Sequence, residues 1–394
     1  MKSQLTSRSA LILIVIAQFL STSLWFAGNA VAPEISQILE LPGILASITS
    51  VVQLGFILGT LLFAVFSIPD RFSPSDVFFF SSILAACLNL LIVILPMQLT
   101  VVLICRFMVG FFLAGIYPVG MKIAADYFQK GLGAALGFLV GALVLGTAFP
   151  HLLKGLDLNL SWKLVLWCTS GLAILGGFVV GFFVPNGPYH KVNSKFDLQL
   201  LPKLSKIKAL KSAASGYFGH MWELYTFWAF VPILIIFFRE NEVMQTNDSL
   251  LSFFVIAIGG ISCAVGGLLA KRLGSRMVAQ VALAGSGICC VLVLFAGGLS
   301  SWIWIGLLLI WGILITADSP QFSTLVAQSV PAEYRGTALT LVNSLGFALS
   351  IVSIQLAQFL LYWITIDQVL ALLFVGPVVG LFLFRFYTSE MAKV

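Results

Sequence analysis

The chain has 394 residues, of which 60% are hydrophobic and only 9% are charged. A soluble globular domain carries about 25% charged residues, so this composition excludes a soluble enzyme and indicates a protein that crosses a membrane repeatedly. The net charge of +6 is not a sign of nucleic-acid binding, because the basic residues fall mainly in short loops between apolar segments.

Apolar segments follow one another along the whole chain, and each is long enough for one transmembrane helix, which needs about 20 residues. Transmembrane strands would instead alternate polar and apolar residues over about 10 positions, and no such segments occur in the sequence. We therefore expect an all-α membrane protein with twelve transmembrane helices. The twelve windows lie near residues 9–30, 42–66, 76–96, 99–125, 131–153, 162–184, 213–238, 249–270, 277–299, 301–325, 336–362 and 366–386.

The first window resembles a secretory signal, since Lys2 and Arg8 precede it and Gly28-Asn29-Ala30 could serve as a cleavage site. The apolar run from Ala10 to Ala30 is nevertheless long enough to span a bilayer. We interpret this run as the first transmembrane helix.

The distribution of basic residues predicts the orientation. With a cytoplasmic N-terminus, all but four of the 21 Lys and Arg residues lie in cytoplasmic segments. The exceptions are Lys154, Lys163 and Arg239, in exterior segments, and Arg106, within a window. The positive-inside rule then places both termini in the cytoplasm.

The longest polar stretch, residues 185–212, lies between the sixth and seventh windows and contains six lysines and a single aspartate. We interpret it as a cytoplasmic linker that touches lipid headgroups, in preference to a specific regulatory site. The linker divides the chain into an N-terminal six-helix bundle, residues 1–184, and a C-terminal six-helix bundle, residues 213–394.

The two halves carry matching features. Pro118 and Pro320 lie inside the fourth and tenth windows, and the basic-glycine pairs Lys130-Gly131 and Arg335-Gly336 open the fifth and eleventh. Parallel duplication of six helices is a known plan of secondary transporters, which bind their substrate near the midplane between the halves. Paired prolines would free backbone carbonyls beside such a site.

The sequence resembles the major facilitator superfamily over essentially its whole length, in the manner of bacterial permeases for small solutes. The loop after the eighth window fits that family's G-x-x-x-D-R-x-G-R-R signature at Gly267, Arg272, Gly274 and Arg276, with Lys271 at the acidic position. The loop after the second window keeps Asp70 and Arg71. Further matches are the R-x-x-x-G element at Arg106 and Gly110 and a looser glycine-proline pattern at Gly137, Gly141, Gly146 and Pro150.

This resemblance implies two pseudo-symmetric six-helix bundles, with the first, fourth, seventh and tenth helices lining a central cavity. It also implies that Asp70 faces the start of the eleventh helix and helps to close the cytoplasmic side, where Asp126 could pair with Arg71. The alternative is that these charges only fix topology and cap helices. The predicted gating residues are Asp70, Arg71, Asp126, Lys271, Arg272 and Arg335.

Four ionisable residues, Arg106, His220, Glu223 and Asp318, lie deep inside apolar windows. A charge near the middle of a bilayer costs about 3 kcal/mol or more unless it meets a partner or water. Such residues usually mark a path for a solute or an ion, so the sequence predicts transport.

We predict that Arg106 binds an anionic part of the substrate, the alternative being an internal pair that fixes helix packing. Glu223 or Asp318 could carry a coupling proton, with Glu223 preferred because His220 lies three residues earlier on the same helix face. A buried, satisfied histidine is an equal alternative for His220. The predicted substrate-binding residues are Arg106, Trp25, Asn29, Gln53, Tyr117, Trp222, Tyr225, Asp318 and Gln321.

Other classes of protein fit less well. No phosphate-binding loop, His-x-x-x-His pair or G-x-S-x-G element occurs, which argues against an ATP-driven pump and against a membrane-embedded enzyme. We predict a monomeric secondary transporter of the bacterial inner membrane for a small organic solute, anionic or amphipathic and proton-coupled. It would need no cofactor or metal, and its partners would be the solute, membrane lipids and protons, with no nucleic acid. The alternatives are efflux or uniport by the same fold, or a channel.

Overall fold

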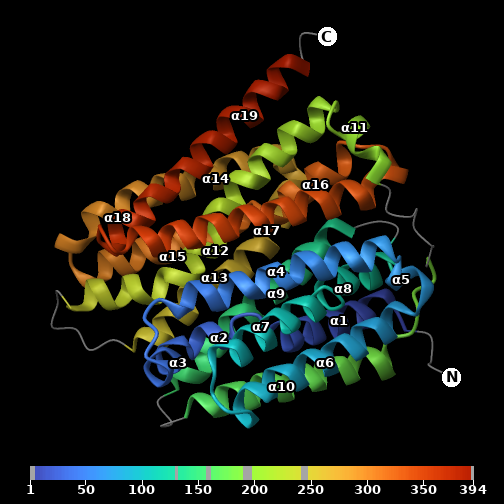
Figure 1. Ribbon diagram of the computed structural model, residues 1–394. Coiled ribbons are helices and arrows are strands. Elements are labelled where there is room, and N and C mark those ends of the chain that lie inside the picture. The colour runs from blue at the N-terminus through green and yellow to red at the C-terminus, as the bar shows by residue number, and fades with distance from the viewer. Residues whose placement is uncertain (1–4, 129–131, 157–160, 190–197, 241–246, 392–394) are drawn as a thin grey trace. The chain divides into compact units, whose positions relative to one another are not determined.

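The computed structural model describes residues 5–128, 132–156, 161–189, 198–240 and 247–391, all of it helices and their connections (Figure 1). The chain forms two compact units, an N-terminal unit of residues Met1–Asn193 and a C-terminal unit of residues Ser194–Val394. The boundary between them falls within the predicted linker.

The described residues of the N-terminal unit form ten α-helices. In chain order they are α1 (Ser7–Thr22), α2 (Ala27–Ala30), α3 (Ala32–Leu39), α4 (Ile44–Val65), α5 (Ile68–Arg71), α6 (Pro74–Ile94), α7 (Leu99–Leu113), α8 (Tyr117–Ala125), α9 (Leu132–Gly155) and α10 (Trp162–Phe178), the last continued by a π-helical turn, Val179–Phe183.

The C-terminal unit is organised in the same way. Its α-helices are α11 (Leu201–Leu204), α12 (Lys208–Glu240), α13 (Asp248–Leu273), α14 (Ser275–Leu292), α15 (Ser301–Ala317), α16 (Ser319–Gln328), α17 (Arg335–Leu360), α18 (Ile366–Ala371) and α19 (Val375–Met391). Short 3₁₀ turns occupy Leu198–Leu200, Val293–Gly298, Ala332–Tyr334 and Leu372–Phe374. Residues 208–212 of the predicted linker belong to α12.

Among the described residues, eleven helical segments are long and apolar enough to cross a membrane, and they coincide with the second to twelfth predicted windows. The first window differs, because α1 ends at Thr22 and the chain turns before α2. The hydroxyl of Thr22 donates to the Gln18 carbonyl and that of Ser23 donates to the Leu20 carbonyl. Hydroxyls that bond to carbonyls of the preceding turn bend helices, and hydropathy does not register this effect.

Both predicted proline positions are helix breaks. Pro118 lies in the first turn of α8 and Pro320 in the first turn of α16, so the fourth and tenth windows are each two helices in succession. Proline removes an N–H and leaves a carbonyl one turn earlier without its helical partner. For Pro320 that carbonyl belongs to Thr316, and it accepts a hydrogen bond from the thiol of Cys263, with Sγ and O 3.3 Å apart.

Glycines allow close packing at equivalent places in the two units. A Cβ atom at Gly110 of α7 would collide with the carbonyl oxygen of Val52 in α4, and one at Gly312 of α15 would collide with that of Val255 in α13. Small residues let membrane helices approach to backbone contact. The internal repeat is therefore visible in the packing as well as in the prolines.

Candidate functional site

The four ionisable residues predicted to lie in the membrane are all completely buried. Arg106 belongs to α7 in the N-terminal unit, whereas His220, Glu223 and the α15–α16 junction residue Asp318 belong to the C-terminal unit. The two groups have different kinds of partner.

Arg106 binds the backbone at the break after α1. Its Nη2 donates to the carbonyl oxygens of Leu24 and Trp25, at 3.0 and 2.6 Å. These carbonyls follow the end of α1, and a cation near a helix C-terminus can satisfy carbonyls there. Gly28 makes room for this arrangement, since a Cβ atom there would lie 2.8 Å from Nε of Arg106.

Asn89 of α6 connects Arg106 to α10. The Nη1 atom of Arg106 donates to Oδ1 of Asn89 at 3.1 Å, while the amide nitrogen of Asn89 donates to Leu166, Thr169 and Ser170. The guanidinium thus donates three hydrogen bonds to neutral acceptors of its own unit, two in the segment after α1 and one in α6. Its Nε atom is buried and has no hydrogen-bond partner among the described residues. An anion that bound here would have to use Nε or displace a carbonyl.

Glu223 of α12 is held by three neutral donors. Nε1 of Trp311 donates to Oε1 at 2.6 Å, Sγ of Cys290 donates to the same oxygen at 3.3 Å, and Oγ of Ser286 donates to Oε2 at 2.8 Å. Ser286 and Cys290 come from α14, and Trp311 comes from α15. Within the described parts of the chain, no lysine or arginine forms an ion pair with this carboxyl group.

The Ser286 hydroxyl can serve either protonation state of Glu223. It also lies 3.1 Å from the carbonyl oxygen of Leu283, to which it can donate. A hydroxyl carries one donor and two acceptor sites. When Glu223 is ionised, Ser286 donates to it; when Glu223 is protonated, Ser286 can accept that proton's hydrogen bond and donate to Leu283 instead.

The contact partner of His220 is Asp318, and a role of His220 beside Glu223 stays a prediction. Nδ1 of His220 lies 2.8 Å from Oδ1 of Asp318, and both side chains are buried. A shared face on α12 does not ensure a shared neighbour, because His220 is directed to the α15–α16 break and Glu223 to α14 and α15. The remaining polar atoms of the pair, Nε2 and Oδ2, are buried without a hydrogen-bond partner among the described residues.

The other predicted substrate-binding residues of the N-terminal unit are mostly buried. The ring of Trp25 lies 4.8 Å from that of Phe56, and the amide of Asn29 donates to Thr49 at 2.7 Å. Gln53 is completely buried, and Tyr117 is partly buried at the start of α8.

In the C-terminal unit, the predicted aromatics pack against neighbouring helices. Trp222 lies against Gly376 of α19, and Tyr225 lies 5.1 Å from the ring of Phe347 on α17. Gln321 is buried in the first turn of α16. A role of these residues in binding substrate stays a prediction.

The predicted gating residues of the N-terminal unit surround the loop after α4. Asp70 of α5 forms an ion pair with Lys122 of α8, and Asp126 is buried at the end of α8. Arg71 is exposed. The partnership of Arg71 with Asp126, and the role of these charges in closing the cytoplasmic side, stay predictions.

The equivalent loop of the C-terminal unit lies between α13 and α14. Gly274 has a φ of +81°, a left-handed conformation that favours glycine over all other residues. Lys271 and Arg272 before it are exposed, as is Arg335 at the start of α17. Arg276, after the turn, donates to the Thr388 hydroxyl at 2.7 Å and lies over the ring of Phe384 at 5.1 Å, which ties the loop to α19.

Sequence reasoning missed the neutral partners Asn89, Ser286, Cys290 and Trp311, and the ion-pair partner Lys122. An isolated Asn or Ser in a transmembrane helix is a weak signal, since such residues often bond their own helix backbone. Lys122 lies four residues before Asp126, on a helix that ends near the predicted membrane surface. This position could have identified Lys122 from the sequence as a candidate for an ion pair.

Comparison with known proteins identifies the family of this chain. The family description "Major Facilitator Superfamily" matches residues 14–354. A curated relative, an ascochitine biosynthesis cluster MFS transporter from Didymella fabae, is 30% identical over 140 residues, which cover 34% of this chain. The alignment spans only 26% of that relative's length.

A solved structure shares the fold. It is a bacterial homologue of the human lysosomal transporter Spinster, crystallised in an inward-facing and occupied conformation. The TM-score is 0.71 at 13% sequence identity, with 99% of this chain and 98% of the other covered. At this level of identity the likeness concerns the fold alone, and it agrees with the predicted two-bundle architecture.

Proposed function

Since the chain belongs to the Major Facilitator Superfamily, we propose that it is a secondary active transporter that moves a small organic solute by alternating access. The protein is a multi-pass membrane protein, with eleven long apolar helical segments among its described residues. We place it in the bacterial inner membrane with both termini in the cytoplasm, following the distribution of Lys and Arg. The internal repeat supports this function, because secondary transporters are commonly built from such halves.

The observation that carries the proton-coupling part of the proposal is the environment of Glu223. This carboxyl group is completely buried, and neutral Trp, Ser and Cys side chains surround it. A buried carboxylate without a cation is costly, and protonation removes that cost. Ser286 can accept or donate without any movement of the backbone. Glu223 is therefore suited to bind and release a proton as its access to water changes.

Asp318 is the second candidate for the coupling proton. Its contact with His220 forms an ion pair only when the imidazole is protonated, so one proton on this pair changes its charge state. The pair lies at the proline break between α15 and α16, where the backbone is interrupted. Two separate buried acids in one unit, each able to hold a proton, favour coupled transport over a channel or a uniporter.

The solute is proposed to be small and organic, with an anionic or amphipathic character. Trp25, Asn29, Gln53, Tyr117, Trp222, Tyr225 and Gln321 would contribute apolar walls and neutral polar contacts. Arg106 would contribute positive charge near the site, although its two Nη atoms already hold the chain after α1. A thermal-shift screen of the purified protein against metabolites and drugs would identify ligands, because a ligand that binds only the folded state raises its apparent stability.

Transport by the Glu223→Gln and Asp318→Asn variants would test the coupling. Each variant is reconstituted in liposomes with a ligand from the screen, with and without an imposed pH gradient. Loss of the coupling acid should abolish accumulation driven by the gradient and preserve exchange between equal compartments. If both variants still respond fully to the gradient, neither acid couples transport to protons. Asp248→Asn, which changes a partly exposed acid at the start of α13, is the matched control.

A further inference from the structure

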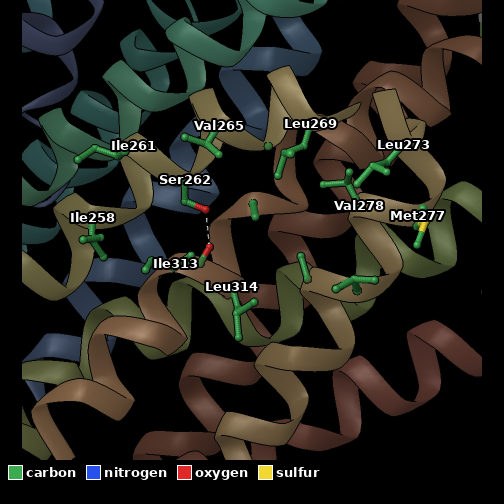
Figure 2. A pocket seen from close by; sticks show the side chains of 14 residues that line it. Ile258, Ile261, Ser262, Val265, Leu269, Leu273, Met277, Val278, Ile313 and Leu314 are labelled. Carbon is green, nitrogen blue, oxygen red and sulfur yellow. Dashed lines mark hydrogen bonds between the residues drawn. The ribbon is translucent and has the colours of Figure 1, made fainter. Parts of the chain in front are cut away.

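The C-terminal unit contains a long groove between α13, α14 and α15 (Figure 2). It encloses about 540 Å³ and runs along α13 from Ile258 to Leu273. At 1.5 Å per residue this stretch of helix is about 22 Å long. One leaflet contributes roughly 15 Å of a hydrocarbon core that is about 30 Å thick. The groove can therefore hold an acyl chain along the depth of a leaflet.

The walls of the groove suit a hydrocarbon. They consist of aliphatic side chains, Met277 and the small residues Gly266, Ala282 and Ala317. The one hydroxyl side chain, that of Ser262, donates to the Ile313 carbonyl at 2.6 Å, as the dashed line in Figure 2 shows. No polar group of the lining is thus left to bind a polar ligand, and an aliphatic chain fits best.

The groove is open along one side. Ile261, Val265, Leu273 and Met277 line it and are exposed. A continuous apolar surface of this kind would promote aggregation in water, but on a transmembrane unit it faces lipid. The groove is therefore accessible to lipid chains from the surrounding leaflet.

Basic residues cluster at one end of the groove. Leu273 and Met277 mark this end. Lys271 and Arg272 lie in the last turn of α13, Arg276 lies in the first turn of α14, and residues 271–277 include no acidic residue. The guanidinium of Arg276 already donates to the Thr388 hydroxyl and lies over the ring of Phe384. Arg272 is exposed and forms no ion pair with any residue that the structure describes.

Arg272 also lies on the side of α13 that lines the groove. It follows two groove-lining residues of α13, Val265 by seven positions and Leu269 by three, so it belongs to the same side of the helix. Lys271, one residue away, points to a different side. A guanidinium at the rim can bind a phosphate through two parallel hydrogen bonds.

We propose that this groove binds one anionic glycerophospholipid, with an acyl chain between α13, α14 and α15 and the phosphate on Arg272. Lys271 adds positive potential beside the headgroup, which favours an anionic lipid over a zwitterionic one. This site does not depend on the proposed transport function. It gives the loop between α13 and α14 a lipid partner in addition to any role in gating.

Native mass spectrometry of the delipidated full-length protein tests the proposal. The probes are dioleoyl phosphatidylglycerol and dioleoyl phosphatidylcholine. The first phosphatidylglycerol molecule to bind should do so at least tenfold more tightly than the first phosphatidylcholine molecule. Arg272→Gln removes the phosphate contact that both lipids can make, so it should weaken the binding of both. It should weaken phosphatidylglycerol more and so reduce the preference, because the lost guanidinium also attracts the net negative charge of that lipid. Val265→Trp, which fills the groove from an exposed position, should weaken the binding of both lipids.

Two variants serve as matched controls. Arg385→Gln removes an exposed basic residue of α19, and Leu268→Trp enlarges an exposed residue of α13 that does not line the groove. Neither should change lipid binding, and circular dichroism checks that all variants are folded. Equal affinity of the unchanged protein for the two lipids would overturn the anionic site. If Val265→Trp and Leu268→Trp change lipid binding equally, the lipid does not bind in the groove.

Discussion

Replacing Arg106 by glutamine is predicted to destabilise the N-terminal unit. The guanidinium donates three buried hydrogen bonds, to the carbonyl oxygens of Leu24 and Trp25 and to Asn89. Glutamine is shorter and has one amide group, so it cannot reach all three acceptors. The two carbonyls belong to residues after α1 that are at most 1% exposed, so bulk water does not reach them to replace the lost donor.

The expected magnitude follows from the number of acceptors that lose their donor. Each buried acceptor left without a donor costs about 1–3 kcal/mol. Loss of two such bonds therefore predicts that the free energy of unfolding falls by about 2–6 kcal/mol. Removal of a buried charge offsets part of this cost, because the guanidinium no longer has to be desolvated.

Unfolding by denaturant in detergent micelles, followed by circular dichroism, measures this change. Arg239→Gln is the matched control, since Arg239 is 38% exposed and its ion pair with Asp248 spans 3.1 Å. An exposed pair contributes about 0–1 kcal/mol. If Arg106→Gln destabilises the protein no more than Arg239→Gln does, the guanidinium does not hold the break after α1.

Three further predictions follow from the contacts. Arg106→Lys keeps the charge but loses Nε, the guanidinium nitrogen that has no hydrogen-bond partner among the described residues, so the affinity for an anionic ligand found by thermal shift should fall at least tenfold; an unchanged affinity in the folded variant would reject substrate binding by Arg106. Asp70→Ala breaks the ion pair with Lys122 and should slow transport and shift the labelling of cysteines introduced on the two faces, while ligand binding is kept; loss of binding with unchanged labelling would contradict gating. Gly110→Ala should lower thermal stability because its Cβ atom would collide with the Val52 carbonyl, whereas Gly171→Ala, with nothing within 4 Å, should not; equal effects would refute close packing of α4 and α7.

Some local features of the fold follow from the sequence because they depend on neighbouring residues. Pro118 and Pro320 end helices wherever the surrounding helices lie, since the missing N–H and the ring are local. The break after Thr22 was not expected, because Ser and Thr bend a helix only when their hydroxyls bond the preceding turn. That choice depends on how α1 packs, and Arg106 of a different helix helps to determine it.

The sequence by itself determined the class of the protein, the positions of its long helices, its internal repeat and the four buried ionisable residues. It could do so because a bilayer forces the backbone to form its hydrogen bonds within each apolar segment, which makes hydropathy a direct record of the helices. Only the tertiary structure decided the partners: Arg106 with backbone carbonyls and Asn89, Glu223 with Ser286, Cys290 and Trp311, and His220 with Asp318. Partners depend on the rotation and packing of helices far apart in the chain, and periodicity along one helix carries no information on which neighbour faces it.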